Sequence, residues 1–472
     1  MQSEAPPAAN PVAAPAAHGG FQHGISVLGG WLPLTVEIVT VVVLIAAIGW
    51  RTGRWRLIWV PISAAVGVGG AFLARLYMDS EGLSSDPAPF QLWVWIAVTI
   101  GAIAVLVLGW RRTRWWRRIL SALAIPLSVL CALLALNQWV GYFPTLQSAW
   151  GAVTAGPLPD QVDASDLAGL RGTNPSTGKV VPVSIPDDAS GFAHRTEYVY
   201  LPPAWFAGPT PPTLPAVMMI AGEFNTPADW MRSGNIIPVV DNYASTHNGQ
   251  TPILVFVDSG GSFNNDTECV DGPRGNSADH LTEDVRPYIV SHFSASSNPA
   301  QWGIIGWSMG GTCAVDLTVM HPDLFSSFVD IAGDAGPTAG TKQQTIDRLY
   351  GGNAATWAKY DPTTVMTSHG PYTGVSGRFE DTGTPAKRYG AGKNGQFPGN
   401  FHRPQQSAAT ASGFGGHDDT PDTDEKGAAE NLCKTATSVS ITCNVNTMTG
   451  GHTWQFAATA FSDALPWIAG KL

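Results

Sequence analysis

The stretch GWSMG at residues 306–310 decides the fold of this chain, and its two flanks strengthen its meaning. An uninterrupted apolar run, residues 302–305, comes directly before it, and residues 312–320 behind it have the composition of a helix. Small residues at both ends of the pentapeptide let a strand and a helix pass close together at a sharp turn. The sequence therefore predicts a strand–turn–helix unit with the Ser308 hydroxyl at its bend.

A G-x-S-x-G spacing at such a turn is typical of the nucleophile elbow of an α/β-hydrolase. Ser308 is therefore the candidate nucleophile, and the next N–H, that of Met309, should point to where an oxyanion forms. The second oxyanion donor usually comes from the loop after an early strand. In that loop Gly222 permits close backbone approach, and the N–H of Glu223 is the candidate donor.

A serine nucleophile needs a base, and the base needs a group that holds its tautomer. In this fold the chain order is serine, acid, histidine. His452 lies on a glycine-flanked loop before an expected terminal helix, which favours it as the base. Three other histidines compete: His321 at the end of the helix after the elbow, and His402 and His417 in a segment without apolar periodicity.

The acid is expected after the strand that follows the apolar run at residues 328–332. We expect that strand at residues 373–376, and two adjacent carboxylates, Glu380 and Asp381, come soon after it. Glu380 is the first choice and Asp381 a close second. Asp334 is a third alternative, because some hydrolases place the acid at the end of the preceding strand.

The first third of the chain has the composition of a membrane-spanning region rather than of a water-soluble domain. Apolar runs fill residues 31–50, 57–74, 92–110 and 119–136, and only the first contains a charge, Glu37. Each run can cross a bilayer core of about 30 Å. The first and third connecting loops are rich in Arg and the second holds only acids, so the positive-inside rule places both Arg loops in the cytoplasm. The N-terminus and everything after the fourth span should then lie outside, the catalytic part on the periplasmic side.

The remaining residues are acidic and hold most of the cysteines. Residues 1–150 carry a net charge of +4 and the rest carries −14, which argues against nucleic acid as a partner. Four cysteines lie in the outer half, where disulfides persist. Three pairings are possible, and our choice is Cys269–Cys313 with Cys433–Cys443. No metal-binding spacing accompanies them, so neither a metal nor another cofactor is expected.

Apolar strand-like runs alternate with helical stretches from residue 179 onward, which predicts a mostly parallel, doubly wound sheet with helices on both faces. The expected organisation is a tail at 1–25, four transmembrane helices at 26–141, a linker at 142–178 and an α/β-hydrolase domain at 179–472. Residues 389–430, rich in Gly, Ser, Ala and Asp, are interpreted as a surface insertion with a solvated acidic cluster, and that cluster includes Glu425.

Several motifs together resemble the esterase D-like family, which includes the mycolyltransferases of mycolate-containing envelopes. The resemblance rests on the run at 198–203, the Gly222 loop with Asp229-Trp230, the elbow, the stretch at 321–325 and Gly451-His452-Thr453-Trp454. It implies an α/β-hydrolase with a Ser–Glu/Asp–His triad and acyl-ester chemistry, hydrolytic or transferring.

The resemblance also bears on substrate contacts. Trp454 matches a tryptophan that lines the sugar site of the mycolyltransferases, and Gly222, Phe224 and Trp307 are the other expected substrate contacts. Ala221 and Phe224 stand where those transferases carry an Asp and an Arg used on trehalose, which argues against trehalose as the acceptor. We therefore expect a membrane-anchored serine esterase or acyltransferase whose substrate is an acyl ester, lipid or glycolipid. The alternative is a non-catalytic envelope-binding protein on the same fold.

Overall fold

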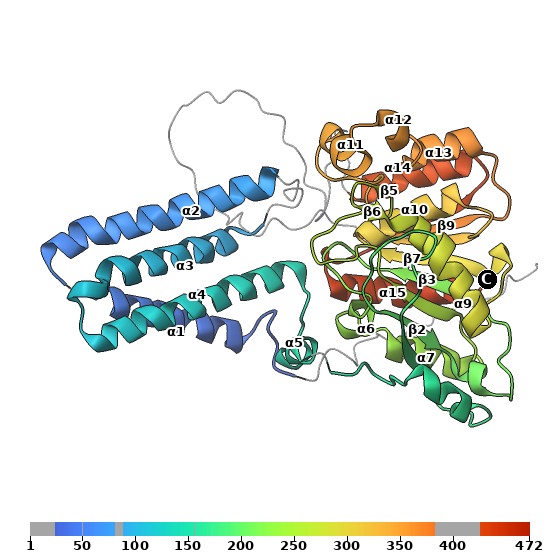
Figure 1. The fold of residues 1–472 in the computed structure, drawn as a ribbon, viewed down its shortest axis with the longest axis horizontal. Coiled ribbons are helices and arrows are strands. Elements are labelled where there is room, and N and C mark those ends of the chain that lie inside the picture. The colour runs from blue at the N-terminus through green and yellow to red at the C-terminus, as the bar shows by residue number, and fades with distance from the viewer. Residues whose placement is uncertain (1–23, 50, 81–87, 155, 383–424) are drawn as a thin grey trace, which may run out of the picture.

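The computed structural model describes residues 24–49, 51–80, 88–154, 156–382 and 425–472. Figure 1 shows two parts side by side: a bundle of long N-terminal helices, in blue and cyan, and an α/β domain built from the rest of the chain. Most of the expected tail and of the expected insertion at 389–430 lies outside the described residues. Residues 425–430 of that insertion already belong to a helix.

The bundle contains four helices that are long and apolar enough to cross a membrane, which confirms the prediction of four such helices in this region. A short π-helical turn, η1 (Trp55–Trp59), leads into the second of them. The four are α1 (Trp31–Ile48), α2 (Val60–Ser80), α3 (Phe90–Gly109) and α4 (Trp115–Val140).

The bundle exposes many large apolar side chains, and it buries several small or weakly polar ones beside Leu92 and Trp95. Leu57 and Leu73 are 80% and 66% exposed, whereas Thr40, Ser128 and Cys131 are buried. This distribution is the reverse of a water-soluble bundle, because large apolar side chains can face lipid and small ones let helices approach closely. The packing pattern therefore supports a lipid environment for these helices.

The second part is a mostly parallel eight-stranded sheet with the order β1-β2-β4-β3-β7-β8-β9-β10. Its first two strands are antiparallel to their neighbours and the others run parallel. A two-residue hairpin, β5 (Asp271–Gly272) and β6 (Gly275–Asn276), lies apart from it. The strands of the large sheet are β1 (Lys179–Val183), β2 (Glu197–Leu201), β3 (Ala216–Ile220), β4 (Ile253–Val257), β7 (Trp302–Trp307), β8 (Ser327–Ile331), β9 (Ser376–Thr382) and β10 (Thr442–Met448).

Helices cover both faces of this sheet, as the continuous apolar strands require. In β3, Met218 packs into the core on one face and Met219 into the core on the other. The first face carries α8 (Ser277–Asp279), η5 (His280–Val285), α9 (Arg286–Phe293), α10 (Met309–Met320), α11 (Lys342–Tyr350), α13 (Pro362–His369) and α14 (Glu425–Ser438). The second carries α6 (Asp229–Arg232), α7 (Ile237–Thr246) and α15 (Trp454–Ala469). This architecture is the predicted α/β-hydrolase fold.

The structure differs from the sequence prediction at the far edge of the sheet. The strand β9 begins at Ser376, where the predicted strand at 373–376 was expected to end. The next strand in the sheet is β10. The sequence analysis did not predict it, because its residues are mostly polar and form no apolar run. This shift places Glu380 and Asp381 within the strand rather than on a loop beyond it.

The segment expected to be a linker at 142–178 packs against the domain. It contains α5 (Leu146–Val153) and η3 (Ala164–Leu170), and the side chains of Leu158 and Leu167 are buried in the two cores. The guanidinium of Arg232 donates hydrogen bonds to the carbonyl oxygens of Gly151 (2.9 Å) and Gly156 (2.7 Å). The four-helix bundle is therefore held against the α/β domain rather than tethered to it by a free spacer.

Both predicted disulfides are confirmed. The structure joins Cys269 to Cys313 and Cys433 to Cys443, and Cys131 is a buried free thiol in α4. The first disulfide connects the loop after β4 to α10, the helix that follows the elbow. The second connects α14 to β10.

Candidate active site

The elbow is a strained turn between β7 and α10. Ser308 has φ 59° and ψ −125°, a conformation that L-residues rarely adopt, and its N–H donates to the carbonyl oxygen of Ile331 (2.9 Å). A Cβ on Gly306 would lie 1.6 Å from the carbonyl oxygen of Gly310, so no larger residue fits there. The turn therefore places a serine at the N-terminal end of α10, where backbone N–H groups point outward.

Gly310 lies tightly against the end of β3, so its substitution should destabilise the elbow. A Cβ at this position would lie 2.2 Å from the carbonyl oxygen of Ile220, a backbone atom that cannot move aside. We expect Gly310→Ala to destabilise the protein by about 1–3 kcal/mol, as overpacking does elsewhere. Thermal melting in detergent measures the effect, and Gly169→Ala is the control, because a Cβ at Gly169 would contact nothing within 4 Å. Equal melting of the two variants would contradict the prediction.

The structure brings Ser308 and His452 together. Nε2 of His452 lies 2.9 Å from Oγ of Ser308. Nδ1 of His452 lies 2.8 Å from Oε1 of Glu425, the first residue of α14. The three side chains are mostly buried: Ser308 is 8% exposed, and the side chains of His452 and Glu425 are 15% and 11% exposed. This arrangement of alcohol, imidazole and carboxylate has the geometry of a catalytic triad.

The carboxylate at the imidazole differs from the predicted one. Glu380 points to the face of the sheet that α15 covers, where it forms an ion pair with Arg378 and accepts a hydrogen bond from Nδ2 of Asn446 (2.8 Å). Asp381 points to the opposite face and accepts the N–H of Thr382 (2.7 Å). Because both lie within β9, neither occupies the position beyond the strand that the prediction assumed. The third alternative, Asp334, donates its N–H to Oγ1 of Thr312 (2.9 Å).

Glu425 was missed because the sequence analysis assigned it to a solvated acidic cluster. One local signal could have found it. Ala428, Ala429, Leu432 and Ala436 are buried along one side of α14, and this spacing of apolar residues is typical of an amphipathic helix. The pattern sets the start of the helix near Glu425, in the expected chain order of serine, acid, histidine.

The predicted oxyanion loop lies directly beside the nucleophile. A Cβ on Gly222 would lie 3.0 Å from Cβ of Ser308, so a larger residue would make Ser308 shift by a few tenths of an ångström. Met309 is the first residue of α10, where a backbone N–H has no partner within the helix. Phe224 has φ 63°, and its ring packs 5.4 Å from that of Phe263, which is 69% exposed. The loop is thus a tight backbone turn with an apolar rim.

The tryptophans expected to contact substrate are packed instead behind the imidazole. The ring of Trp307 lies 4.3 Å from that of His452, and Trp454 packs edge-on against Trp230 at 5.3 Å. Trp307 and Trp454 are only 4% and 2% exposed. They offer little surface to a ligand, and they fix the position of the His452 ring.

Several carboxyl groups lie around the site, and burial raises the pKa values of some of them, so that they tend to stay neutral. Burial and the nearby carboxylate of Asp266 raise the pKa of Glu223 well above its ordinary value. Burial and the carboxylate of Asp381 do the same to the pKa of Asp330, beneath the elbow. A protonated Glu223 is compatible with an oxyanion nearby, whereas a charged one would repel it.

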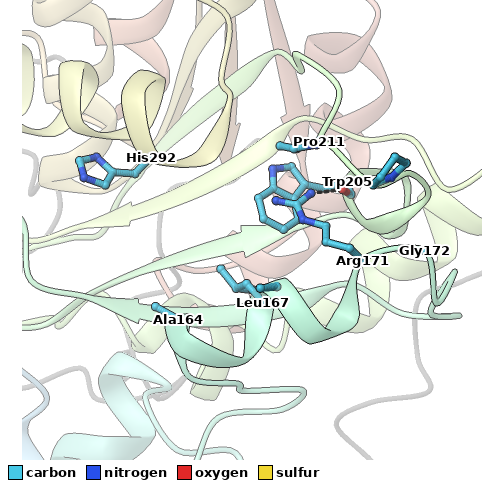
Figure 2. A pocket seen from close by; sticks show the side chains of 9 residues that line it. Ala164, Leu167, Arg171, Gly172, Trp205, Pro211 and His292 are labelled. Atoms are coloured by element: carbon cyan, nitrogen blue, oxygen red, sulfur yellow. Dashed lines mark hydrogen bonds between the residues drawn. The ribbon is translucent and has the colours of Figure 1, made fainter.

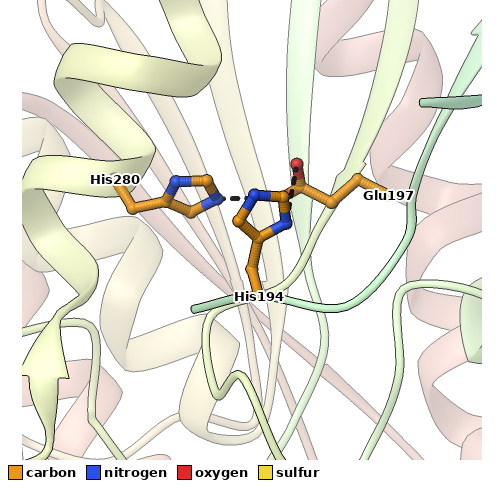
Figure 3. Close-up of side chains that lie close together, drawn as sticks. All are labelled: His194, Glu197 and His280. Carbon is orange, nitrogen blue, oxygen red and sulfur yellow. Dashed lines mark hydrogen bonds and ion pairs between the residues drawn. The ribbon is translucent and has the colours of Figure 1, made fainter. Parts of the chain in front are cut away.

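One group of side chains has the composition of a metal site, away from the elbow. Figure 3 shows His194, Glu197 and His280 close together, and their ligand atoms lie within 4.8 Å of one another. However, the ring nitrogens of His194 lie 2.9 Å and 2.7 Å from the carbonyl oxygens of Arg195 and Ile185, so those carbonyls already occupy them. The group is better described as stacked imidazoles around a buried carboxylate.

A hollow of about 700 Å³ lies on another part of the domain (Figure 2). The guanidinium of Arg171 lies 3.3 Å above the ring of Trp205 and donates to its carbonyl oxygen (2.8 Å), and Leu167 and His292 also line the hollow. None of the residues that line it belongs to the arrangement around Ser308.

Comparison with known proteins finds one matching family and a relative of similar length. The profile of the Esterase family, described as "Putative esterase", matches residues 193–468. An uncharacterized protein of Corynebacterium glutamicum is 27% identical over 449 residues, which cover 93% of this chain and 95% of that protein.

The chain is also similar to solved structures, each with a TM-score below 0.5. A ferulic acid esterase is 16% identical with a TM-score of 0.45, covering 63% of this chain and 100% of that one. An S-formylglutathione hydrolase from Agrobacterium tumefaciens is 18% identical with a TM-score of 0.44, covering 62% and 99%. MPT51 from Mycobacterium tuberculosis is 15% identical with a TM-score of 0.37, covering 61% and 99%.

Proposed function

Because this chain belongs to the Esterase family, whose match spans residues 193–468, we propose that it is a membrane-anchored serine esterase or acyltransferase that works through an acyl-enzyme. The observation that carries this proposal is the continuous contact from Ser308 through His452 to Glu425, at 2.9 Å and 2.8 Å. An alcohol with this support can attack an ester carbonyl at neutral pH.

The proposed reaction has two halves. Oγ of Ser308 attacks the ester carbonyl carbon while its proton passes to Nε2 of His452, and the N–H groups of Met309 and Glu223 stabilise the oxyanion. The intermediate then collapses, and the leaving alkoxide takes the proton from His452 as the acyl–Ser308 ester remains. In the second half, water or an acceptor hydroxyl gives its proton to His452 and attacks that ester. The acid or the new ester leaves, and Ser308 recovers its proton.

The proposed substrate is an acyl ester of a lipid or glycolipid at the outer membrane–water interface, with the catalytic domain outside the cytoplasm. The Arg-rich loops of the bundle support that orientation. On α5, Leu146, Trp150 and Val153 are 46%, 69% and 78% exposed and share one side of the helix. An exposed apolar stripe of this kind suits a helix that lies in the interface. Transfer to a sugar or lipid hydroxyl is the finer form of the proposal, and hydrolysis the simpler one.

Covalent labelling tests the proposal. The full-length protein in detergent micelles should react with a fluorophosphonate and gain one adduct per chain, because the reagent needs an activated serine rather than a particular substrate. Mass spectrometry should place the adduct on Ser308, and Ser308→Ala should remove it. Ser326→Ala, a change at another buried serine, is the control that keeps labelling. A folded preparation that takes up no adduct would favour the alternative, a non-catalytic envelope-binding protein.

A further inference from the structure

The chain leaves the last membrane helix through a turn of fixed shape. The side chain of Asn137 donates to the carbonyl oxygen of Phe143 (2.9 Å) and accepts its N–H (2.7 Å). The carbonyl oxygen of Asn137 accepts the N–H of Gly141 (2.8 Å), and Gly141 has the left-handed conformation that ends the helix. Residues 141–143, here called the exit turn, are therefore held rigidly to α4.

The exit turn packs against the loop that carries His452. Nε2 of Gln455 donates to the carbonyl oxygen of Gly141 (2.9 Å). A Cβ on Gly141 would lie 2.5 Å from Oε1 of Gln455 and 2.8 Å from Cβ of Thr453. The contact thus begins at Thr453, the residue after His452. It leaves no room for a side chain at position 141. The membrane helices and the catalytic loop meet at this point.

The side chain of Tyr142 extends this contact towards the oxyanion loop. It packs against the core that contains Trp230 and Trp454, and its hydroxyl lies beside the carboxylate of Asp229 and the side chain of Asn225. Burial and the Asp229 carboxylate raise the pKa of Tyr142, so the hydroxyl stays protonated and can donate to that carboxylate.

Asn225 and Asp229, the two residues beside the Tyr142 hydroxyl, both form hydrogen bonds that hold the backbone of the oxyanion loop. The N–H of Asn225 donates to the carbonyl oxygen of Gly222 (3.2 Å), and Nη2 of Arg195 donates to the carbonyl oxygen of Asn225 (2.9 Å). Oδ2 of Asp229 accepts the N–H of Thr226 (2.6 Å). A left-handed residue inside this loop, Phe224, costs free energy that its surroundings must offset. The conformation of the loop therefore depends on these hydrogen bonds.

We propose that Tyr142 is a positioning residue through which the membrane anchor holds the oxyanion loop in its catalytic shape. The inference rests on the proposed function, because it concerns the second oxyanion donor of that reaction. In this arrangement the anchor is part of the catalytic structure, since the turn that ends its last helix supports the backbone next to Gly222. The catalytic domain without residues 141–143 would lose that support.

The test removes one hydroxyl from the full-length protein in detergent micelles. Tyr142→Phe should lower kcat for p-nitrophenyl butyrate about tenfold and leave KM within about twofold, because loss of an oxyanion donor outright typically costs about 10²–10³ and misplacement costs part of that. Rates are expressed per active site, titrated by the end point of fluorophosphonate labelling, so unfolded protein does not count. Tyr288→Phe is the matched control, because its ring stacks on His292 in α9.

One outcome would overturn the inference: a Tyr142→Phe variant whose kcat per titrated site equals that of the wild type. If the number of titrated sites falls at the same time, Tyr142 is a purely structural residue. This outcome leaves the proposed function intact, because the wild type is labelled and active. A wild type that is neither labelled nor active would instead defeat the proposed function, and this inference with it.

Discussion

Replacing His452 by Ala should reduce kcat for p-nitrophenyl butyrate by about 10⁵–10⁶-fold, close to the effect expected of Ser308→Ala. Without the imidazole 2.9 Å from its oxygen, the Ser308 hydroxyl has no group to take its proton. The measurement is steady-state hydrolysis by the full-length protein in detergent micelles, with folding checked by thermal melting. His247→Ala is the control. That histidine is exposed beside α7, one of the helices that cover the sheet, and its ring stacks on that of Tyr243.

The double variant makes this prediction sharper. Residues that act as one unit lose activity together, so Ser308→Ala combined with His452→Ala should be no slower than either change alone. A non-catalytic binding protein predicts the opposite pattern, in which His452→Ala changes nothing measurable. Activity of His452→Ala above about a tenth of the wild type would contradict the triad, since general-base catalysis alone contributes about 10²–10⁴-fold.

The parts of the site that could be predicted from sequence are those whose residues lie in short, contiguous segments. The apolar run of β7, the glycines around Ser308 and the glycine-flanked His452 each reflect a local backbone requirement. The four long helices could also be predicted, because a bilayer imposes its length and polarity on every span. The four cysteines outside the bundle allow three pairings, and the structure confirms the one that was chosen.

The parts that could not be predicted depend on contacts between distant segments. The strand β10 has no apolar run of its own, and it exists because it pairs with β9. Trp454 stands in a motif that suggests a ligand contact, but the distant Trp230 packs against it and leaves it 2% exposed. Tyr142 follows a membrane helix in a stretch that indicates only a linker. Its position beside Asn225 and Asp229 emerges from the three-dimensional fold.

The identity of the acid gives the second large prediction. Glu425→Gln should lower kcat by about 10³–10⁴-fold, the range found when a triad carboxylate is replaced by an amide. The carboxylate 2.8 Å from Nδ1 keeps the proton on that nitrogen and stabilises the imidazolium that forms during attack. An amide has the same shape but lacks the charge, and it can also turn its NH₂ towards the ring. KM should remain within about twofold, because Glu425 is not placed to touch the substrate.

The predicted acids provide the matched controls for this measurement. Glu380→Gln replaces a carboxylate paired with Arg378 on the α15 face by an amide, and Asp381→Asn makes the same kind of change on the opposite face. We expect each to change kcat by less than about threefold, while Glu380→Gln lowers thermal stability because its ion pair is buried. A large loss of kcat in either control, with Glu425→Gln near wild type, would return the acid to β9. The charge that matters would then come from the strand and not from the helix that starts at Glu425.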